Sequence, residues 1–176
     1  WFEVEVACPA GTLYRFNIDG ENTVPDPASR AQALDVHGWS RVVDPLAYEW
    51  RHSQWQGRPW HTAVIYELHV GAMGGYAAVE KHLPRLAELG VTAIELMPLA
   101  QFPGERNWGY DGVLPYPPHA TYGTPEQLKQ LIDSAHGHGL AVILDVVYNH
   151  FGPDGNYLGQ YAQGFFQEDV HTPWGA

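Results

Sequence analysis

Three short apolar segments, separated by two segments of helical periodicity, constrain the fold of this chain most strongly. Residues 63–71 (AVIYELHVG), 91–98 (VTAIELMP) and 140–147 (LAVILDVV) have apolar side chains at neighbouring positions, which is typical of strands buried on both faces. Between them, residues 75–90 and 124–139 repeat apolar side chains at helical spacing. Because buried strands that alternate with helices form parallel sheets, the order predicts a βαβαβ unit of an α/β fold.

The ends of both helical segments carry capping signals. Gly90 is placed to end the first helix, whereas Pro84 should break or restart it, because proline cannot continue the hydrogen-bond ladder. The second segment begins with Thr124 as N-cap, Pro125 at the first helical position and Gln127 three residues after the cap. These residues predict where the two helices begin and end.

Two architectures accept this order of elements. A doubly wound sheet usually has a glycine-rich phosphate loop after its first strand, but residues 69–78 (HVGAMGGYAA) lack the G-x-G-x-x-G spacing. A (β/α)8 barrel carries its functional side chains in the loops that follow its strands, and here the loops after the second and third segments are rich in polar and aromatic residues. We therefore predict that residues 61–176 form the N-terminal part of a (β/α)8 TIM barrel, containing strands 1–3 and truncated before the others.

The residues before this unit predict a different structure. Residues 1–6 (WFEVEV) and 12–20 (TLYRFNIDG) alternate apolar and polar side chains, and the second segment stops at a turn signal, DG. We interpret them as an antiparallel pair at the end of a small β-sandwich domain of immunoglobulin-like type. Residues 21–60 are rich in proline and aromatic residues and are expected to be a linker that packs on its neighbours through its aromatic side chains. The predicted domains are therefore residues 1–60 and residues 61–176.

The charge of the chain limits its partners. Twenty Asp and Glu residues oppose nine Lys and Arg residues, which gives a formal net charge of -11. Nucleic acid and anionic membrane surfaces both require a basic face, so we expect neither as a partner, and a neutral polar ligand fits better. Aromatic residues make up 13% of the chain, including seven Trp. Most should pack internally, but flat rings with polar edges are also natural platforms for sugar rings.

The location of the protein is predicted from what its sequence lacks. Cys8 is the only cysteine, so we expect no internal disulfide. We find no apolar stretch of membrane-spanning length and no signal-peptide pattern, and we expect a cytoplasmic protein. Because the chain begins at Trp1 rather than Met and ends at Ala176, we expect both ends to be cut from a longer protein. The sequence leaves the oligomeric state open.

Polar side chains cluster where the third apolar segment ends. Asp145 lies within an apolar run, and a buried carboxylate must be paired or hydrogen-bonded, so a structural role that fixes the loop is favoured for it. His150 stands at the exit of the strand, where a role in a functional site is favoured over a role in the core.

A second cluster follows the second apolar segment. Trp108, Gly109, Tyr110, Asp111 and Gly112 combine two glycines, which let the backbone turn closely, with aromatic and carboxylate side chains. The alternative is a surface turn with a packed Trp. Because adjacent barrel strands bring their C-terminal loops together, we expect the two clusters to meet.

The two clusters resemble signature regions of the α-amylase superfamily, glycoside hydrolase family 13. DVVYNH at residues 145–150 resembles the region at the end of barrel strand three, and WGYDG at residues 108–112 resembles the loop after strand two. The phrases NHFGPDGNYL and HTPWG are similar to those of a subfamily that releases trehalose from maltooligosyl trehalose. The resemblance runs from residue 63 to the end, and a small β-sandwich before the barrel also fits it.

The resemblance implies roles for the residues of both clusters. Tyr110 stacks on the sugar ring at the cleaved position, and His150 hydrogen-bonds the hydroxyl groups of that sugar. Asp111 contacts the same sugar or buttresses the site, while Asp145 and Asn149 brace the loop. The implied substrate-binding set is Trp108, Tyr110, Asp111 and His150. In calcium-dependent relatives the residue at the position of Asn149 ligates calcium, but we see no further cluster of oxygen ligands and expect neither metal nor cofactor.

The resemblance also implies a retaining double displacement that uses two carboxylates. The expected substrate is an α-1,4-glucan oligosaccharide with a trehalose end, cleaved at the α-1,4-glucosidic bond next to the trehalose. The nucleophilic Asp is placed on barrel strand four, the acid/base Glu on strand five and a supporting Asp on strand seven, all beyond Ala176. Glu95, Asp145 and Asp154 do not match them by motif position. We therefore expect no catalytic residue in this chain and no activity of the chain alone.

Three other functions stay open. A glycogen branching enzyme or another family 13 hydrolase is the alternative within the superfamily, and a non-catalytic fragment that binds α-glucan is an alternative of another class. The presence of ten His residues also suggests a metal-binding protein as a third hypothesis. His136 and His138, however, lie at the end of a predicted helix, where the dipole favours a cation, and ligands from a second element are missing.

Overall fold

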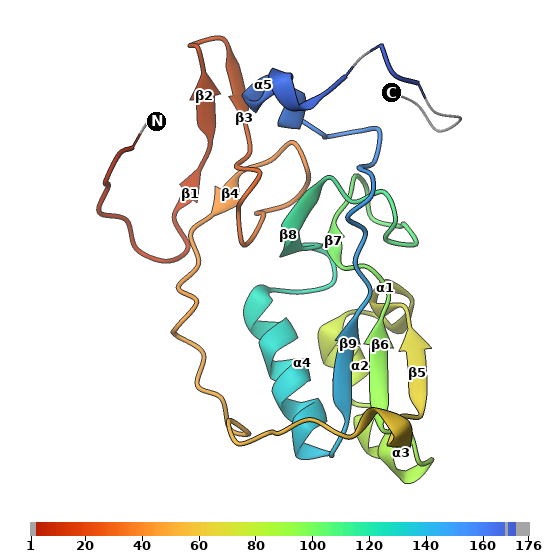
Figure 1. The fold of residues 1–176 in the computed structure, drawn as a ribbon. Coiled ribbons are helices and arrows are strands. Elements are labelled where there is room, and N and C mark those ends of the chain that lie inside the picture. The colour runs from red at the N-terminus through yellow and green to blue at the C-terminus, as the bar shows by residue number, and fades with distance from the viewer. Residues whose placement is uncertain (1–2, 168, 172–176) are drawn as a thin grey trace.

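Three parallel strands form the centre of the structure, a computed structural model that describes residues 3–167 and 169–171. The strands are β5 (Ile65–Leu68), β6 (Ala93–Leu96) and β9 (Ala141–Leu144), in the order β5-β6-β9 (Figure 1). The register pairs Leu68 with Leu96 and Leu96 with Leu144, so all three strands end at the same level. The predicted parallel βαβαβ unit is confirmed.

Helices connect these strands as the periodicity predicts. Between β5 and β6 lie α1 (Val70–Met73), α2 (Tyr76–Glu80) and α3 (Leu83–Glu88), and α4 (Pro125–Gly137) precedes β9. Pro84 occupies the first turn of α3, which confirms that it restarts the helix. Gly90 follows α3 with a φ of 93°, a left-handed conformation that glycine adopts without strain. Thr124 and Gln127 form the predicted capping box.

The hydrophobic core lies between the sheet and these helices. Ile94 of β6 belongs to the same buried cluster as Leu83 of α3 and Leu131 of α4. The predicted burial on both faces holds for β6, but Ile65 of β5 is 41% exposed and Leu144 of β9 is 49% exposed. Both strands form edges of the sheet within the described residues, so no strand covers their outer sides.

The N-terminal region contains two small antiparallel pairs rather than the predicted one. β1 (Leu13–Tyr14) pairs with β4 (Ser40–Arg41), and β2 (Phe16–Ile18) pairs with β3 (Asn22–Val24). The strand predicted for residues 1–6 is wrong over residues 3–6, where Val4 is 81% exposed, because none of the described strands pairs with it; residues 1–2 are outside the described range. The turn at Asp19 and Gly20 is confirmed by positive φ values of 55° and 80°. The immunoglobulin-like sandwich and the domain boundary after residue 60 stay predictions.

The predicted linker packs along α4 on its way to the short 3-10 helix η1 (Trp60–Thr62) that precedes β5. Asp133 of α4 is fully buried and accepts hydrogen bonds from the backbone nitrogens of Arg51 and His52 at 3.0 and 2.9 Å. The ring of Trp55 stacks on His136 with centroids 4.7 Å apart. The predicted linker of residues 21–60 is therefore wrong at β3 and β4, which lie within it, while its later part packs on α4 through the aromatic ring of Trp55.

The loop after β6 contains strands that the sequence did not predict. β7 (Ala100–Gln101) and β8 (Leu114–Pro118) form an antiparallel pair within residues 98–123. Three prolines in β8 make it unlike a strand in the sequence, but a two-stranded sheet tolerates residues without an N–H donor. Beyond β9 the chain forms α5 (Leu158–Tyr161) and the 3-10 helix η2 (Gln163–Phe165). In the described residues, none of the helices has the length and hydropathy needed to cross a membrane.

Candidate functional site

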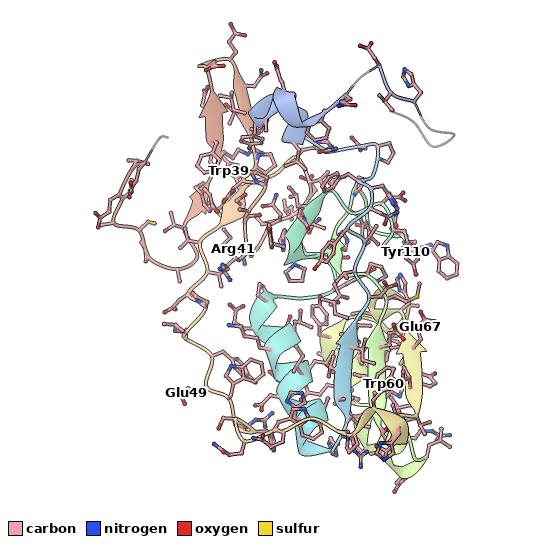
Figure 2. The ribbon with its side chains drawn as sticks, viewed as in Figure 1. Trp39, Arg41, Glu49, Trp60, Glu67 and Tyr110 are labelled. Carbon is pink, nitrogen blue, oxygen red and sulfur yellow. The ribbon has the colours of Figure 1, made fainter. Side chains whose placement is uncertain are left out.

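The carboxyl ends of the three parallel strands bring the candidate residues together. His69 directly follows β5, Asp145 directly follows β9, and residues 107–112 turn back from the loop after β6. Figure 2 shows Tyr110 beyond this end of the sheet and Trp60 near the opposite end. A hydrogen bond between Tyr110 and Asp145 shows that the loop after β6 meets the end of β9, as expected.

Tyr110 joins the two clusters found in the sequence. Its hydroxyl group donates to a carboxylate oxygen of Asp145 at 3.0 Å, and its backbone carbonyl oxygen accepts from Nε2 of His150 at 2.8 Å. The hydrogen bond to Asp145 and partial desolvation raise the pKa of the Tyr110 hydroxyl, so the phenol stays protonated as a donor. Asp145 therefore holds the loop after β6, a contact that reasoning about its own loop did not predict.

The contact with Tyr110 also assigns the tautomer of neutral His150. A carbonyl oxygen only accepts hydrogen bonds, so Nε2 of His150 carries the proton and Nδ1 is left as an acceptor for a ligand. Asn149, next to it at the strand exit, is exposed. The bracing role of Asn149 stays a prediction.

Asn107, which the sequence did not single out, organises the turn that carries Tyr110. Its Oδ1 accepts from the backbone nitrogen of Gly109 at 2.8 Å, and its Nδ2 donates to a carboxylate oxygen of Asp111 at 2.6 Å. Gly109 has a φ of 101°, and a Cβ at this position would lie 2.5 Å from the carbonyl oxygen of Pro98. The prediction that glycine allows a close turn here is confirmed.

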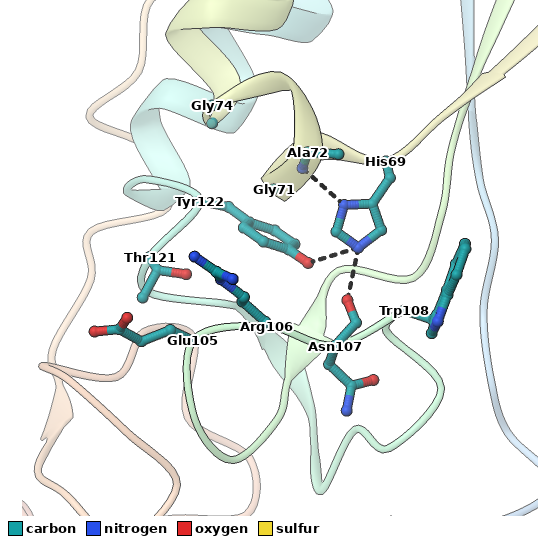
Figure 3. A pocket seen from close by; sticks show the side chains of 11 residues that line it. His69, Gly71, Ala72, Gly74, Glu105, Arg106, Asn107, Trp108, Thr121 and Tyr122 are labelled. Atoms are coloured by element: carbon teal, nitrogen blue, oxygen red, sulfur yellow. Dashed lines mark hydrogen bonds between the residues drawn. The ribbon is translucent and has the colours of Figure 1, made fainter.

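A pocket of about 750 Å³ opens beside this turn (Figure 3). The rings of Tyr122 and Trp108 flank His69 in its wall, and the backbone of the glycine-rich α1 segment lines another side. Trp108 is 73% exposed, so its ring is available to a ligand and is not the packed Trp of a surface turn. Arg106 and Thr121 add polar groups to the lining.

His69 is a second residue of the candidate site that was not singled out from the sequence. Its Nδ1 accepts from the backbone nitrogen of Ala72 at 2.9 Å, and its Nε2 lies 2.6 Å from the backbone oxygen of Asn107. The sequence did contain a signal, because His69 lies at the end of the first predicted strand in the same way that His150 stands at the exit of the third.

Buried aromatic rings support the pocket from below. Tyr122 is 4% exposed and meets His119 edge-on, and His119 stacks on Phe102 with ring centroids 3.6 Å apart. Burial lowers the pKa of His119 to about 4. The ring is therefore neutral at neutral pH, as a fully buried imidazole must be.

Metal ligands do not gather in the described part of the chain. Residues 3–167 and 169–171 contain no group of three or more His, Cys, Asp or Glu side chains that could hold a metal ion. His136 packs on Trp55, and Asp154 lies 3.4 Å from His37. These side chains have structural neighbours within the fold.

Comparisons with known proteins extend the resemblance seen in the sequence. The family model of the alpha amylase catalytic domain matches residues 31–170. The malto-oligosyltrehalose trehalohydrolase of Deinococcus radiodurans is 49% identical over 99% of this chain and 29% of its own length. A crystal structure from Salmonella typhimurium, described as an alpha amylase, has a TM-score of 0.92 at 56% identity and covers 96% of this chain and 29% of that one. GBS pullulanase SAP, solved in complex with maltotetraose, has a TM-score of 0.66 at 26% identity and covers 82% of this chain and 25% of that one.

These matches fix the family and the coarse fold. The chain spans less than a third of the length of the relatives it matches. They support an α/β fold related to the TIM barrel, as the order of strands and helices predicts. Because the family model matches most of its length, the chain belongs to the alpha-amylase family.

Proposed function

We propose that this chain forms part of a glycoside hydrolase that cleaves the α-1,4-glucosidic bond next to the terminal trehalose of maltooligosyl trehalose and releases trehalose. The observation that carries the proposal is the network in which Tyr110 contacts both Asp145 and His150 at the carboxyl end of the sheet, where barrel enzymes bind substrate. The 49% identity to a malto-oligosyltrehalose trehalohydrolase favours this reaction over others of the family.

The side chains of the network suit a neutral sugar. The ring of Tyr110 offers a flat face for the apolar C–H surface of a glucosyl unit, while Nδ1 of His150 hydrogen-bonds a hydroxyl group. Asp111 contacts the same sugar, and Asp145 and Asn149 brace the site. Trp108 offers a second platform beside the pocket, where a neighbouring glucosyl unit stacks.

The ligand is proposed to be an α-1,4-glucan with a trehalose end. The complex of GBS pullulanase SAP with maltotetraose supports an α-glucan ligand. The formal net charge of -11 does not repel an uncharged oligosaccharide, whereas it disfavours phosphate-rich partners. Location in the cytoplasm stays part of the proposal.

The residues of this chain bind and orient, while the bond-breaking groups are proposed to lie on later strands of the same barrel. A nucleophilic Asp would form the glycosyl-enzyme bond as an acid/base Glu protonates the leaving oxygen, and water would then hydrolyse the intermediate with retention. Without these two carboxylates the covalent route is absent. Residues 1–176 alone are therefore expected to release no trehalose.

The test is to incubate the full-length protein with maltooligosyl trehalose and to analyse products by NMR. The proposal predicts one trehalose for each shortened maltooligosaccharide. New α-1,6 branches would instead indicate a branching enzyme, and release of maltose or glucose another hydrolase of the family. Binding of maltotetraose without any product would indicate a non-catalytic glucan-binding protein.

A further inference from the structure

We propose that His69 is a positioning residue that holds the turn of residues 107–112, and with it Tyr110 and Asp111, in the geometry needed for catalysis. This inference rests on the proposed function. His69 does not need to touch the substrate for this role, because it acts through Asn107.

The hydrogen bonds of His69 define one tautomer. The backbone N–H of Ala72 only donates, so Nδ1 of His69 must accept, at 2.9 Å. Nε2 therefore carries the proton of the neutral ring and donates to the carbonyl oxygen of Asn107 at 2.6 Å, as drawn in Figure 3. The hydroxyl group of Tyr122 also lies 3.4 Å from Nε2 of His69.

Asn107 passes this restraint on to the site. With its carbonyl oxygen held by His69, its side chain bonds the backbone nitrogen of Gly109 and the carboxylate of Asp111. Tyr110 lies between these two partners in the sequence. Release of Asn107 therefore loosens the backbone on both sides of Tyr110.

The register of the sheet explains why His69 can hold the turn of residues 107–112. Leu68 and Leu144 stand at the same level on either side of β6, so His69 and Asp145 follow at the same level. His69 holds the turn through Asn107, and Asp145 holds it through the hydroxyl group of Tyr110. The turn is thus fixed from the strands on both sides of β6, and loss of either contact leaves one side free.

Two substitutions separate this role from capping of α1. His69→Asn places an amide oxygen near the position of Nδ1, and Asn is a good N-cap, so the Ala72 bond is kept while the donor to Asn107 is lost. His69→Gln carries an amide N–H near the position of Nε2, so the donor to Asn107 is kept while the cap is lost. His82→Asn, at an exposed His, is the matched control.

The experiment measures kcat, KM and Tm of the full-length variants, and amide hydrogen exchange of a peptide spanning residues 107–112. His69→Asn should lower kcat about tenfold and speed exchange at Gly109, with Tm nearly unchanged, because a misplaced positioning contact costs turnover rather than stability. His69→Gln should recover most of the turnover and lower Tm slightly. His82→Asn should match the wild type.

The reverse pattern would overturn the proposal. If His69→Asn keeps full turnover and slow exchange while His69→Gln loses Tm, His69 only caps a helix. If both variants lose protection from amide hydrogen exchange throughout β6 and β9, His69 stabilises the whole sheet rather than the turn. If the wild type releases no trehalose, the proposed function fails, and exchange at residues 107–112 still decides the role of His69.

Discussion

The hydroxyl group of Tyr110 donates to a carboxylate oxygen of Asp145 across 3.0 Å, and this contact ties the loop after β6 to the end of β9. The two residues are 35 positions apart in the sequence. Their contact places a flat aromatic ring at the mouth of the sheet with its polar edge already bound, which leaves the ring face for a ligand.

Tyr110→Phe tests this contact in the full-length protein. The substitution keeps the ring but removes the donor to Asp145, so we expect kcat/KM for maltooligosyl trehalose to fall about tenfold, the loss typical of one hydrogen bond to a charged group. Tyr110→Ala should cost more, because the stacking surface is lost as well. Tyr116→Phe, at a tyrosine that is 69% exposed on β8, serves as the control. Equal activity of Tyr110→Phe, Tyr110→Ala and the wild type would show that no sugar stacks there.

Asp133→Ala tests the packing of the linker on α4. The buried carboxylate accepts from the backbone and side chains of both Arg51 and His52. Its removal leaves two backbone N–H groups without partners, so urea unfolding should show a loss of about 3 kcal/mol. Glu126→Ala, at an exposed carboxylate of the same helix, should cost less than about 1 kcal/mol. Equal losses in both variants would contradict the anchoring role.

We also expect Asp133 to make the stability of the protein depend on pH. Burial alone would raise the pKa of Asp133, but the hydrogen bonds from Arg51 and His52 hold it well below its usual range. A carboxyl group with a lowered folded pKa stabilises the protein above its unfolded pKa, 3.8 here, and this contribution is lost as the pH falls below that value. In acid unfolding, the difference in stability between wild type and Asp133→Ala should therefore shrink as the pH falls below the unfolded pKa.

We expect His119 to change the stability of the protein in a higher pH range than Asp133 does. Burial lowers its pKa from 6.5 to about 4, and neither ring nitrogen has a hydrogen-bond partner among the described residues. Between these values the unfolded chain binds the proton and the folded chain does not, so the stability should fall as the pH is lowered from 6.5 to 4. His119→Phe keeps a ring on Phe102 without a titrating group. Its stability advantage over the wild type should grow as the pH falls from 6.5 to 4, and a constant difference would contradict the assignment.

Elements with strong local signals could be predicted from the sequence. The start of α3 around Pro84 and the start of α4 after Thr124 could be predicted, because proline geometry and capping depend on a few neighbouring residues. The position of the site followed from a general property of barrels, since strands that end at one edge bring their loops together. Tyr110, Asp145 and His150 were selected in this way and contact one another in the structure, while their roles stay predictions.

Pairings between distant residues could not be predicted in the same way. Residues 3–6 alternate like a strand but pair with no strand in the described part of the chain, whereas the two-residue strand β4 pairs with β1 without any periodic pattern. The contacts of Asn107 depend on the path of a long loop, and its side chain gives no local signal of them. Short strands and side-chain networks are decided by tertiary contacts, which a local pattern does not contain.

The measurement that tests the account most directly is the turnover of His150→Ala in the full-length protein with maltooligosyl trehalose as substrate. If His150 binds the sugar at the cleaved position more strongly in the transition state, kcat should fall about a hundredfold, equivalent to about 2.7 kcal/mol, as for other preorganised hydrogen-bonding groups. Because His150 is exposed, Tm should hardly change. An unchanged kcat together with a large fall in Tm would contradict the account, since His150 would then support the fold and not the chemistry.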